Sequence, residues 1–514
     1  DQAKHVAKLG NINLTLEELK VYANQLSQVL DYMDQLSKVN TSDIKPTFQI
    51  IDDTVNIFRQ DKIKPCLSQK AALSTAEKTY KGYFIADHVF SQSQKRNSTK
   101  KILKRKALDK YNAVLTQVDL RGTVGHKDLF VTKGIETTAG SKVLEGYQPQ
   151  YSATVVKKFE EQGLKTKYKL NQDAWGHGSS GENSGFGPTK NPWDLTRIPG
   201  GSSSGSAVAV ATQDVDISTG TDTCGSIRMP SHYSNAVGIK PTYGAVSRYG
   251  VIAFASSLDC PGLFSNSVSK LQHYFKQIVG ADRKDATSQS QLRNKSQKQN
   301  VKVIGLPKEF FAKGIDKRVK KSVTTAAKLL KKQGYQLKEI TLPHTEYAVA
   351  AYYIIAPTET SSNLARYDGV RFGQDRSYFG SEAKRRIMLG SFASSAGYAD
   401  KYYETAAKIR TLIINDFTKA FKSVDIILGP SAPSPAFKIG AKADNPLEMY
   451  LTDVYAAPAS LSGLPSLALP CGFTENNLPI GMQLIGSRWS EQALFDLGEK
   501  YQQLTDWHTR KPKI

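Results

Sequence analysis

The chain has 514 residues, 39% of them apolar, and its 69 Lys and Arg residues outnumber its 47 Asp and Glu residues to give a formal charge of +22. This composition supports a packed core in about two to four domains and excludes wholesale disorder. The positive charge suits contact with a polyanion, although a lysine-rich surface accounts for it equally well.

Membrane, secretion and metal signals are weak throughout the sequence. No apolar run reaches the roughly 18 residues of a membrane-spanning helix, and residues 1–10 lack the apolar core of a signal peptide. The four cysteines are far apart in the sequence: Cys66, Cys224, Cys260 and Cys471. They form no C-x-x-C pair, so we expect no disulfide framework, no metal site and a reducing, cytoplasmic compartment.

Residues 1–90 are expected to form a small helical unit followed by extended chain. Thr15 and Glu18 have the T-x-x-E spacing of a capping box, and apolar residues recur behind them at helical spacing as far as Leu36. The segment from Ile44 to Phe90 lacks the periodicity that a core of its own would need. We therefore expect it to lie over a larger body.

Residues 91–110 carry eight basic residues and a single acidic one, whereas residues 1–94 are neutral overall. Such a run is typical of a solvated tether, and the more specific alternative is a segment that contacts a nucleic acid. We interpret it as a basic linker between two parts of the chain.

From Tyr111 onward, strand-like and helix-like segments alternate. Buried strands are expected at 301–306 and 424–428, and a basic amphipathic helix at 317–334. This alternation is typical of an α/β domain whose helices cover a largely buried sheet, and we assign residues 111–514 to it.

Two Gly/Ser-rich loops carry the clearest chemical signal. Gly200–Ser206 and Gly220–Arg228 flank an apolar helix-like segment, so the fold can bring hydroxyl groups and backbone N–H groups together. This suits an oxyanion hole better than a phosphate cradle, because no G-x-x-x-x-G-K-[ST] is present. A serine nucleophile needs a base, and the residues alone leave His126, His177 and Lys127 open.

These residues together resemble the amidase signature family of serine hydrolases. Lys127 lies 75 residues before Ser202, and Ser202 lies 24 before Ser226, as in that family. Neighbouring segments resemble more specifically the A-subunit family of the glutamyl-tRNA(Gln) amidotransferases: residues 182–189, 191–195, 238–244 and 247–250. The resemblance covers about residues 111–514 and implies the amidase signature fold, a mixed central sheet covered by helices.

The N-terminal part is similar to the small C subunit of the same amidotransferases. The similarity lies in four segments: residues 4–9, 30–33, 44–47 and 58–61. In that family the C subunit is a belt between the A and B subunits. The resemblance therefore implies a C–A fusion, with residues 91–110 as the join.

The resemblance also implies a catalytic arrangement. Ser226 is the expected nucleophile, and neutral Lys127 is expected to draw a proton from Ser202, which relays one from Ser226. Ser202 is expected after a cis peptide bond. The oxyanion hole is expected from the backbone of four residues: Thr223, Cys224, Gly225 and Ser226.

A glutamine substrate would present an α-carboxylate and an α-ammonium group. The matching family positions are Arg386 for the carboxylate and Asp453 for the ammonium, with a structural salt bridge as the alternative for Arg386. Further pocket positions implied by the resemblance are Ser203, Thr223 and Tyr353. Tyr352 competes with Tyr353 for its place.

Four positions depart from the family pattern: Leu129, Ala174, Ser204 and Cys224. Cys224 replaces a glycine, so it would be strained if the site required a positive φ. All three catalytic positions are retained, which favours an active enzyme.

The function implied is that of a glutaminase component, which releases ammonia from glutamine for a tRNA-dependent amidotransferase. A separate B-type partner would bind ATP, Mg²⁺ and misacylated tRNA and convert Glu-tRNA(Gln), or Asp-tRNA(Asn), to the amide; this chain itself needs no cofactor and no membrane. The alternatives are a stand-alone amidase on other small amides, and a non-catalytic assembly scaffold, which Cys224 and Leu129 motivate.

Overall fold

The computed structural model describes residues 2–51, 61–63, 65–74, 78–85, 110–290, 301–312, 314–370 and 373–513. The chain divides into two compact units, one of Asp1–Asp52 with Arg105–Ile514 and one of Asp53–Lys104. All of the expected basic linker except Lys110 lies outside the described residues. The division at residues 90 and 110 therefore stays a prediction.

The first unit is built on a mixed sheet, which in the described residues has eleven strands in the order β10-β9-β11-β13-β12-β7-β8-β6-β4-β5-β3. The strands are β3 (Val114–Gln117), β4 (Val124–Lys127), β5 (Thr166–Leu170), β6 (Ile217–Asp222), β7 (Val237–Lys240), β8 (Cys260–Ser265), β9 (Val303–Pro307), β10 (Gln336–Ile340), β11 (Ile426–Pro430), β12 (Ser466–Phe473) and β13 (Pro479–Gly486). β4 runs parallel to β5 and β6, whereas β6 pairs antiparallel with β8. The expected mixed α/β architecture is confirmed.

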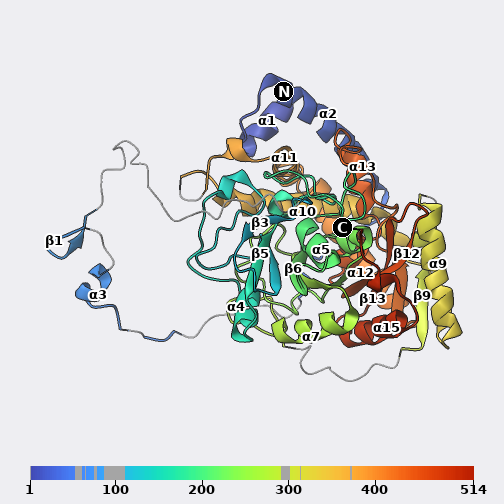
Figure 1. Ribbon diagram of the computed structural model, residues 1–514. Coiled ribbons are helices and arrows are strands. Elements are labelled where there is room, and N and C mark those ends of the chain that lie inside the picture. The colour runs from blue at the N-terminus through green and yellow to red at the C-terminus, as the bar shows by residue number, and fades with distance from the viewer. Residues whose placement is uncertain are drawn as a thin grey trace. The chain divides into compact units, whose positions relative to one another are not determined.

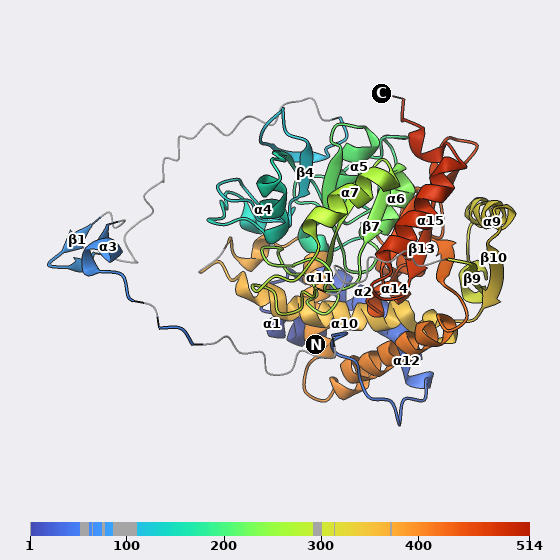
Figure 2. The ribbon, with the colours of Figure 1, turned by 90° about the horizontal axis from the view of Figure 1, so that it is seen from below.

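Helices cover both faces of this sheet. They are α4 (Thr154–Glu161), α5 (Ser204–Ala211), α6 (Arg228–Ser234), α7 (Val268–Ile278), α9 (Lys317–Lys332), α10 (Ala348–Asn363), α11 (Ser381–Ala393), α12 (Thr405–Ala420), α13 (Pro446–Tyr450), α14 (Ala457–Leu461) and α15 (Glu491–Gln503). Figures 1 and 2 show α10, α11 and α12 on one side of the sheet and α7 and α15 on the other. No helix of the described residues is long and apolar enough to cross a membrane.

The N-terminal helices α1 (Gln2–Leu9) and α2 (Leu16–Met33) pack against this body, and α2 touches α10, α11 and α13. The predicted capping box is present, since Thr15 Oγ1 accepts from Glu18 N at 3.1 Å and Glu18 Oε2 accepts from Thr15 N at 2.9 Å. Tyr22 and Met33 on the apolar stripe of α2 are buried. Burial of this stripe holds the helix in place, as the sequence predicts.

The chain after α2 continues along the body as far as residue 51. Thr47 N donates to Ala407 O on α12 at 3.1 Å, and Ile50 O accepts from Arg488 Nη1 at 3.0 Å. The expected draping is confirmed for residues 44–51. For later residues it stays a prediction, because they belong to the second unit.

The described part of the second unit contains α3 (Gln69–Leu73) and a hairpin of β1 (Thr79–Tyr80) and β2 (Tyr83–Phe84). Gln69 Nε2 donates to Gly82 O at 3.0 Å and so ties the helix to the hairpin turn. Both strands are exposed, which agrees with the weak periodicity of this segment.

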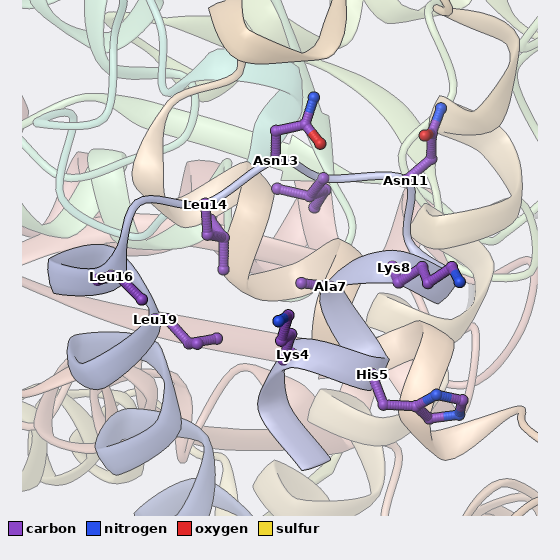
Figure 3. Close-up of a pocket in the computed structure, with 10 residues that line it drawn as sticks. Lys4, His5, Ala7, Lys8, Asn11, Asn13, Leu14, Leu16 and Leu19 are labelled. Atoms are coloured by element: carbon purple, nitrogen blue, oxygen red, sulfur yellow. The ribbon is translucent and has the colours of Figure 1, made fainter. Parts of the chain in front are cut away.

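A cavity of about 660 Å³ lies between α1 and the start of α2 in the first unit. Figure 3 shows Lys4 and Lys8 of α1 on one side of this cavity, with Leu14 and Leu19 on the other. It is separate from the Gly/Ser loops.

Candidate active site

The ends of two neighbouring strands position the candidate site. β4 ends at Lys127, and the parallel β6 ends at Asp222, immediately before the second Gly/Ser loop. The first Gly/Ser loop leads into α5, and Ser203 joins the two loops by donating its N–H to Ser226 O at 3.3 Å and its hydroxyl to Thr221 O at 3.2 Å. The fold thus brings together residues that are up to a hundred positions apart.

Lys127 is the base candidate that faces these loops. Its Nζ donates to Ser202 Oγ and to Thr221 Oγ1, both at 2.7 Å, and its side chain is fully buried. Burial lowers the pKa of Lys127 to about 7, against the opposing charges of Asp173, Asp259 and Asp222. A lysine with this pKa is neutral in a large fraction of molecules near pH 7 and can accept a proton.

The two histidines left open by the sequence are placed differently. His126 precedes Lys127 in β4, so its side chain points to the other face of the sheet, where its ring lies near Phe130 and Phe159. His177 packs edge-on against Phe254. Burial lowers the pKa of both imidazoles, to about 3 for His126. Of the three candidates, the structure brings only Lys127 into hydrogen-bonding contact with Ser202.

Ser202 follows a cis peptide bond from Gly201, as expected. A Cβ at position 201 would overlap the Asp173 carboxylate and lie 2.7 Å from Gly181 N, so the loop requires glycine there. Asp173 N also donates to Ser202 O at 3.2 Å. These contacts hold the Ser202 hydroxyl against Lys127.

Ser226 lies in the loop after β6, and its side chain is buried. Within the described residues, no hydrogen bond joins the Ser226 hydroxyl to that of Ser202. The Lys127–Ser202 half of the expected relay therefore has a direct contact, and the Ser202–Ser226 half stays a prediction.

A buried ion pair that the sequence reasoning missed shapes this loop. Arg228 Nε and Nη2 each donate to the Asp222 carboxylate at 3.0 Å, and both residues are fully buried. Arg228 Nη2 also donates to the carbonyl of Cys224, and Asp222 Oδ2 accepts from Ile227 N at 3.2 Å. The signal in the sequence was an acid and an arginine six residues apart at the two ends of the loop.

Cys224 causes no backbone strain, because its φ is not positive. Burial and the nearby Asp453 raise the pKa of its thiol well above the ordinary value, so the thiol stays protonated and is no competing nucleophile. A Cβ on the following Gly225 would lie 2.6 Å from Ala456 Cβ, so glycine is required at that position instead.

The other departures from the family pattern also fit into packed surroundings. Leu129 is in the hydrophobic core, and its carbonyl accepts from Ile252 N at 3.0 Å. Ser204 Oγ lies 2.9 Å from Thr189 Oγ1, within hydrogen-bonding distance. Ala174 N donates to Asn183 O at 3.0 Å. None of these positions interrupts the contact between Lys127 and the first loop.

Asp259 is a second acid that the sequence reasoning missed. Its carboxylate accepts from Thr223 Oγ1 at 2.8 Å and from the N–H groups of Phe254 and Ala255 at 2.8 and 3.1 Å. It thereby anchors the expected oxyanion loop to the segment after β7. Sequence spacing carried no signal for it, since the contact spans 36 residues.

Arg386 and Asp453, the expected pocket charges, are both buried near the loop. Asp453 accepts from Tyr353 Oη at 2.7 Å and from Ser179 Oγ at 2.9 Å, and burial raises its pKa to about 6. The Arg386 guanidinium lies over the Tyr353 ring at 5.1 Å. The Tyr353 hydroxyl contact with Asp453 favours Tyr353 over Tyr352 as the pocket residue.

Arg386 also makes the salt bridge that the alternative interpretation predicts. Its Nε lies 2.7 Å from Oε1 of Glu382, one turn earlier on α11. In the described residues, no group of three His, Cys, Asp or Glu side chains is placed to hold a metal ion. The arrangement suits acyl transfer at a serine, with one fixed positive side chain, Arg386, and one ionisable acid, Asp453, buried nearby.

Two protein families match different parts of the chain. The family described as Amidase matches residues 89–495, and the family described as Glu-tRNAGln amidotransferase C subunit matches residues 14–85. The first match spans most of the chain.

Curated relatives are similar at the sequence level. The A subunit of glutamyl-tRNA(Gln) amidotransferase from Myxococcus xanthus is 49% identical over 411 residues, covering 76% of this chain and 85% of the relative. The protein of the same name from Lactococcus lactis is 48% identical over 412 residues, with the same coverage.

Solved structures are similar to this chain as well. The crystal structure of the A subunit of glutamyl-tRNA(Gln) amidotransferase from Thermotoga maritima has a TM-score of 0.66 and 39% identity, covering 76% of this chain and 86% of that one. The structure of 6-aminohexanoate cyclic dimer hydrolase has a TM-score of 0.69 at 20% identity, which shows a shared fold alone.

Proposed function

Because the chain belongs to the amidase family, we propose that it is the glutamine-hydrolysing component of a glutamyl-tRNA(Gln) amidotransferase. The observation that carries the proposal is the buried Lys127, whose pKa falls to about 7 and whose Nζ is 2.7 Å from Ser202 Oγ. Such a lysine is a base that works near neutral pH. The names of the similar proteins support the substrate, and the buried Arg386 and Asp453 suit its two charges.

In the proposed first half-reaction, Ser226 Oγ attacks the amide carbon of glutamine. The Ser226 proton passes to Ser202 while the Ser202 proton passes to neutral Lys127. The tetrahedral intermediate collapses as its C–N bond breaks, and the proton held by Lys127 returns through Ser202 to the leaving nitrogen. Ammonia departs and a γ-glutamyl ester remains on Ser226.

In the second half-reaction, water attacks the ester carbonyl and gives its proton to the same relay. The ester bond breaks, glutamate departs, and Ser226 regains its proton. Backbone N–H groups from Thr223 to Ser226 would stabilise the oxyanion in both halves, an effect of about 3 kcal/mol for each donor. The buried pair of Asp222 and Arg228 stabilises this loop, because Asp222 accepts from Ile227 N and Arg228 donates to the Cys224 carbonyl.

Substrate selection is proposed to rest on charge. The Arg386 guanidinium would bind the α-carboxylate, and the Asp453 carboxylate would bind the α-ammonium group. Tyr353 orients Asp453 through their hydrogen bond. The hydroxyls of Ser203 and Thr223 already donate within the protein, so we assign them to shaping the pocket wall.

The N-terminal match supports a C–A fusion in a larger complex. We propose that residues 1–90 act as the belt, 91–110 as the join and 111–514 as the amidase domain. A B-type partner would hold ATP, Mg²⁺ and misacylated tRNA and use the ammonia on Glu-tRNA(Gln) or Asp-tRNA(Asn). A role in supplying amidated tRNA for translation agrees with a cytoplasmic location. The proposed hydrolysis of glutamine needs no cofactor in this chain.

The test is ammonia release from glutamine by the full chain and by its Ser226→Ala variant. We expect the variant to lose hydrolysis while keeping its fold, because it lacks the attacking oxygen. Full ammonia release by the variant would show that Ser226 is not the nucleophile. A preference for uncharged aliphatic amides over glutamine would instead identify a stand-alone amidase.

A non-catalytic scaffold is tested separately with an electrophilic amide-like probe. Covalent labelling that Ser226→Ala abolishes supports catalysis, whereas an unlabelled wild-type chain would identify a scaffold. Cys224 is a built-in check on this experiment, since its protonated thiol should not react.

A further inference from the structure

Glu382 on α11 shares one buried carboxylate between two arginines. Its Oε1 accepts from Arg386 Nε at 2.7 Å and from Tyr450 Oη at 3.3 Å, and its Oε2 accepts from Arg385 Nη1. Burial alone would raise the pKa of Glu382, but the charges of Arg385 and Arg386 hold it below its ordinary value. The carboxylate is therefore a charged bridge between the two guanidinium groups.

This bridge restrains Arg386 on one side only. Glu382 takes the Nε edge, and the rings of Phe254, Tyr353 and Tyr450 lie 5.1 to 5.6 Å from the guanidinium carbon. Among the described residues, no acceptor is hydrogen-bonded to the two terminal nitrogens of Arg386. Those nitrogens keep the fork geometry that binds a carboxylate with two parallel hydrogen bonds.

Arg385 connects the same bridge to the N-terminal helix α2. Its Nε donates to Gln25 Oε1 at 3.0 Å, and its guanidinium lies 5.9 Å from the centre of the Tyr22 ring. The Tyr22 hydroxyl donates to Ser381 O at 3.2 Å, at the start of α11. Lys384 on α11 also pairs with Glu18 of α2, so the two helices are joined at three successive turns of α2.

We propose that Gln25 and Arg385 are positioning residues that orient Arg386 for the substrate carboxylate through Glu382. The N-terminal segment then sets the affinity of the amidase domain for glutamine through one continuous path of side chains. The inference rests on the proposed function, because it takes glutamine as the substrate that Arg386 binds. It adds a role for α2 beyond covering the body.

The physical reason is that a guanidinium bound on one edge can rotate about that edge. Arg385 fixes the second oxygen of Glu382, which stops the carboxylate from turning and carrying Arg386 with it. Gln25 fixes Arg385 in turn. Loss of the Gln25 amide leaves Arg385 charged and paired but free to shift, so the terminal nitrogens of Arg386 lose their alignment without loss of the pocket.

The experiment compares Gln25→Ala with Gln28→Ala in the full chain. Gln28 is on the same helix and is exposed, and among the described residues its side chain bonds only to Asn24 of that helix, so it is a matched control. The substrates are glutamine and 4-aminobutanamide, which keeps the amide and the ammonium group but has no carboxylate. Kinetic constants for both are measured with each variant.

We expect Gln25→Ala to raise KM for glutamine about threefold to tenfold with a smaller change in kcat, which corresponds to the net free energy of one ordinary hydrogen bond. KM for 4-aminobutanamide should not change, and Gln28→Ala should behave as wild type. Gln25→Glu restores an acceptor for Arg385 and should restore the KM for glutamine. A purely structural effect would raise KM for both substrates and would resist this rescue.

Two outcomes separate the inference from its premise. If wild type prefers glutamine but Gln25→Ala changes both substrates equally or neither, the positioning role is wrong and the proposed pocket stands. If wild type hydrolyses both amides equally well, Arg386 does not bind a carboxylate, and the proposed pocket is wrong. Glu382→Gln provides a stronger perturbation of the bridge and should raise KM for glutamine alone by about tenfold or more.

Discussion

Lowering the pH from 7 to 6 is expected to reduce kcat/KM for glutamine about tenfold, since two buried groups lose their active forms together. Burial brings the pKa of Lys127 to about 7 and that of Asp453 to about 6. The base must be neutral and the carboxylate ionised, so both groups favour the higher pH. The sign is therefore a rise in activity with pH.

The magnitude follows from the populations of the two groups. Neutral Lys127 falls from about one half of molecules at pH 7 to about one tenth at pH 6, a roughly fivefold loss. Ionised Asp453 falls from about nine tenths to about one half, a roughly twofold loss. A lysine of ordinary pKa would be neutral at pH 7 in only about one molecule in three thousand, and the activity would keep rising to about pH 10.

The assay is the initial rate of ammonia release at low glutamine concentration between pH 5.5 and 9. Burial also raises the pKa of Asp173 to about 7, and Asp173 lies in the field of Lys127, so the midpoint belongs to the two groups together. Lys127→Met supplies the control, because it keeps the side-chain volume and should be inactive at every pH. A flat profile from pH 6 to 9, or a midpoint near pH 10, would refute the assignment of Lys127 as the base.

Two further predictions concern the loops themselves. Arg228→Leu leaves the Asp222 carboxylate buried and unpaired, so it should lower the free energy of unfolding in urea by about 3–5 kcal/mol. The control is Arg121→Leu, which removes an exposed pair and should change the free energy of unfolding by less than about 1 kcal/mol. Equal effects of the two variants would contradict the structural role of the buried pair. Gly201→Ala forces a Cβ into the buried carboxylate of Asp173, so it should abolish glutamine hydrolysis and lower Tm. The control is Gly380→Ala, whose Cβ meets open space and which should keep Tm within a few degrees of wild type. A fully active Gly201→Ala variant would contradict the loop geometry.

Local structure in this chain follows from short stretches of sequence. The capping box at Thr15 and Glu18 and the apolar stripe behind it predict α2, and the structure has both. The alternation after Tyr111 predicts the mixed α/β body for a similar reason, since helix and strand periodicities are read within a few residues. The two Gly/Ser loops are visible because glycine at such density has a conformational purpose.

The residues taken alone do not identify the catalytic base. His126 and Lys127 are adjacent in sequence, yet the alternation of a strand sends one to each face of the sheet. Which face carries the loops depends on the pairing of β4 with β6, a contact between segments about ninety residues apart. In the sequence, the family resemblance is what distinguishes Lys127 from the two histidines.

Sequence alone determined the residue types that the chemistry needs, the loops that carry them and the local elements around them. The tertiary structure decided which of those residues meet and what protonation state burial gives them. The lowered pKa of Lys127, the buried pair of Asp222 and Arg228, and the path from Gln25 to Arg386 all require distant segments to pack together. Desolvation and charge proximity are properties of that packing, and neither is encoded in spacing along the chain.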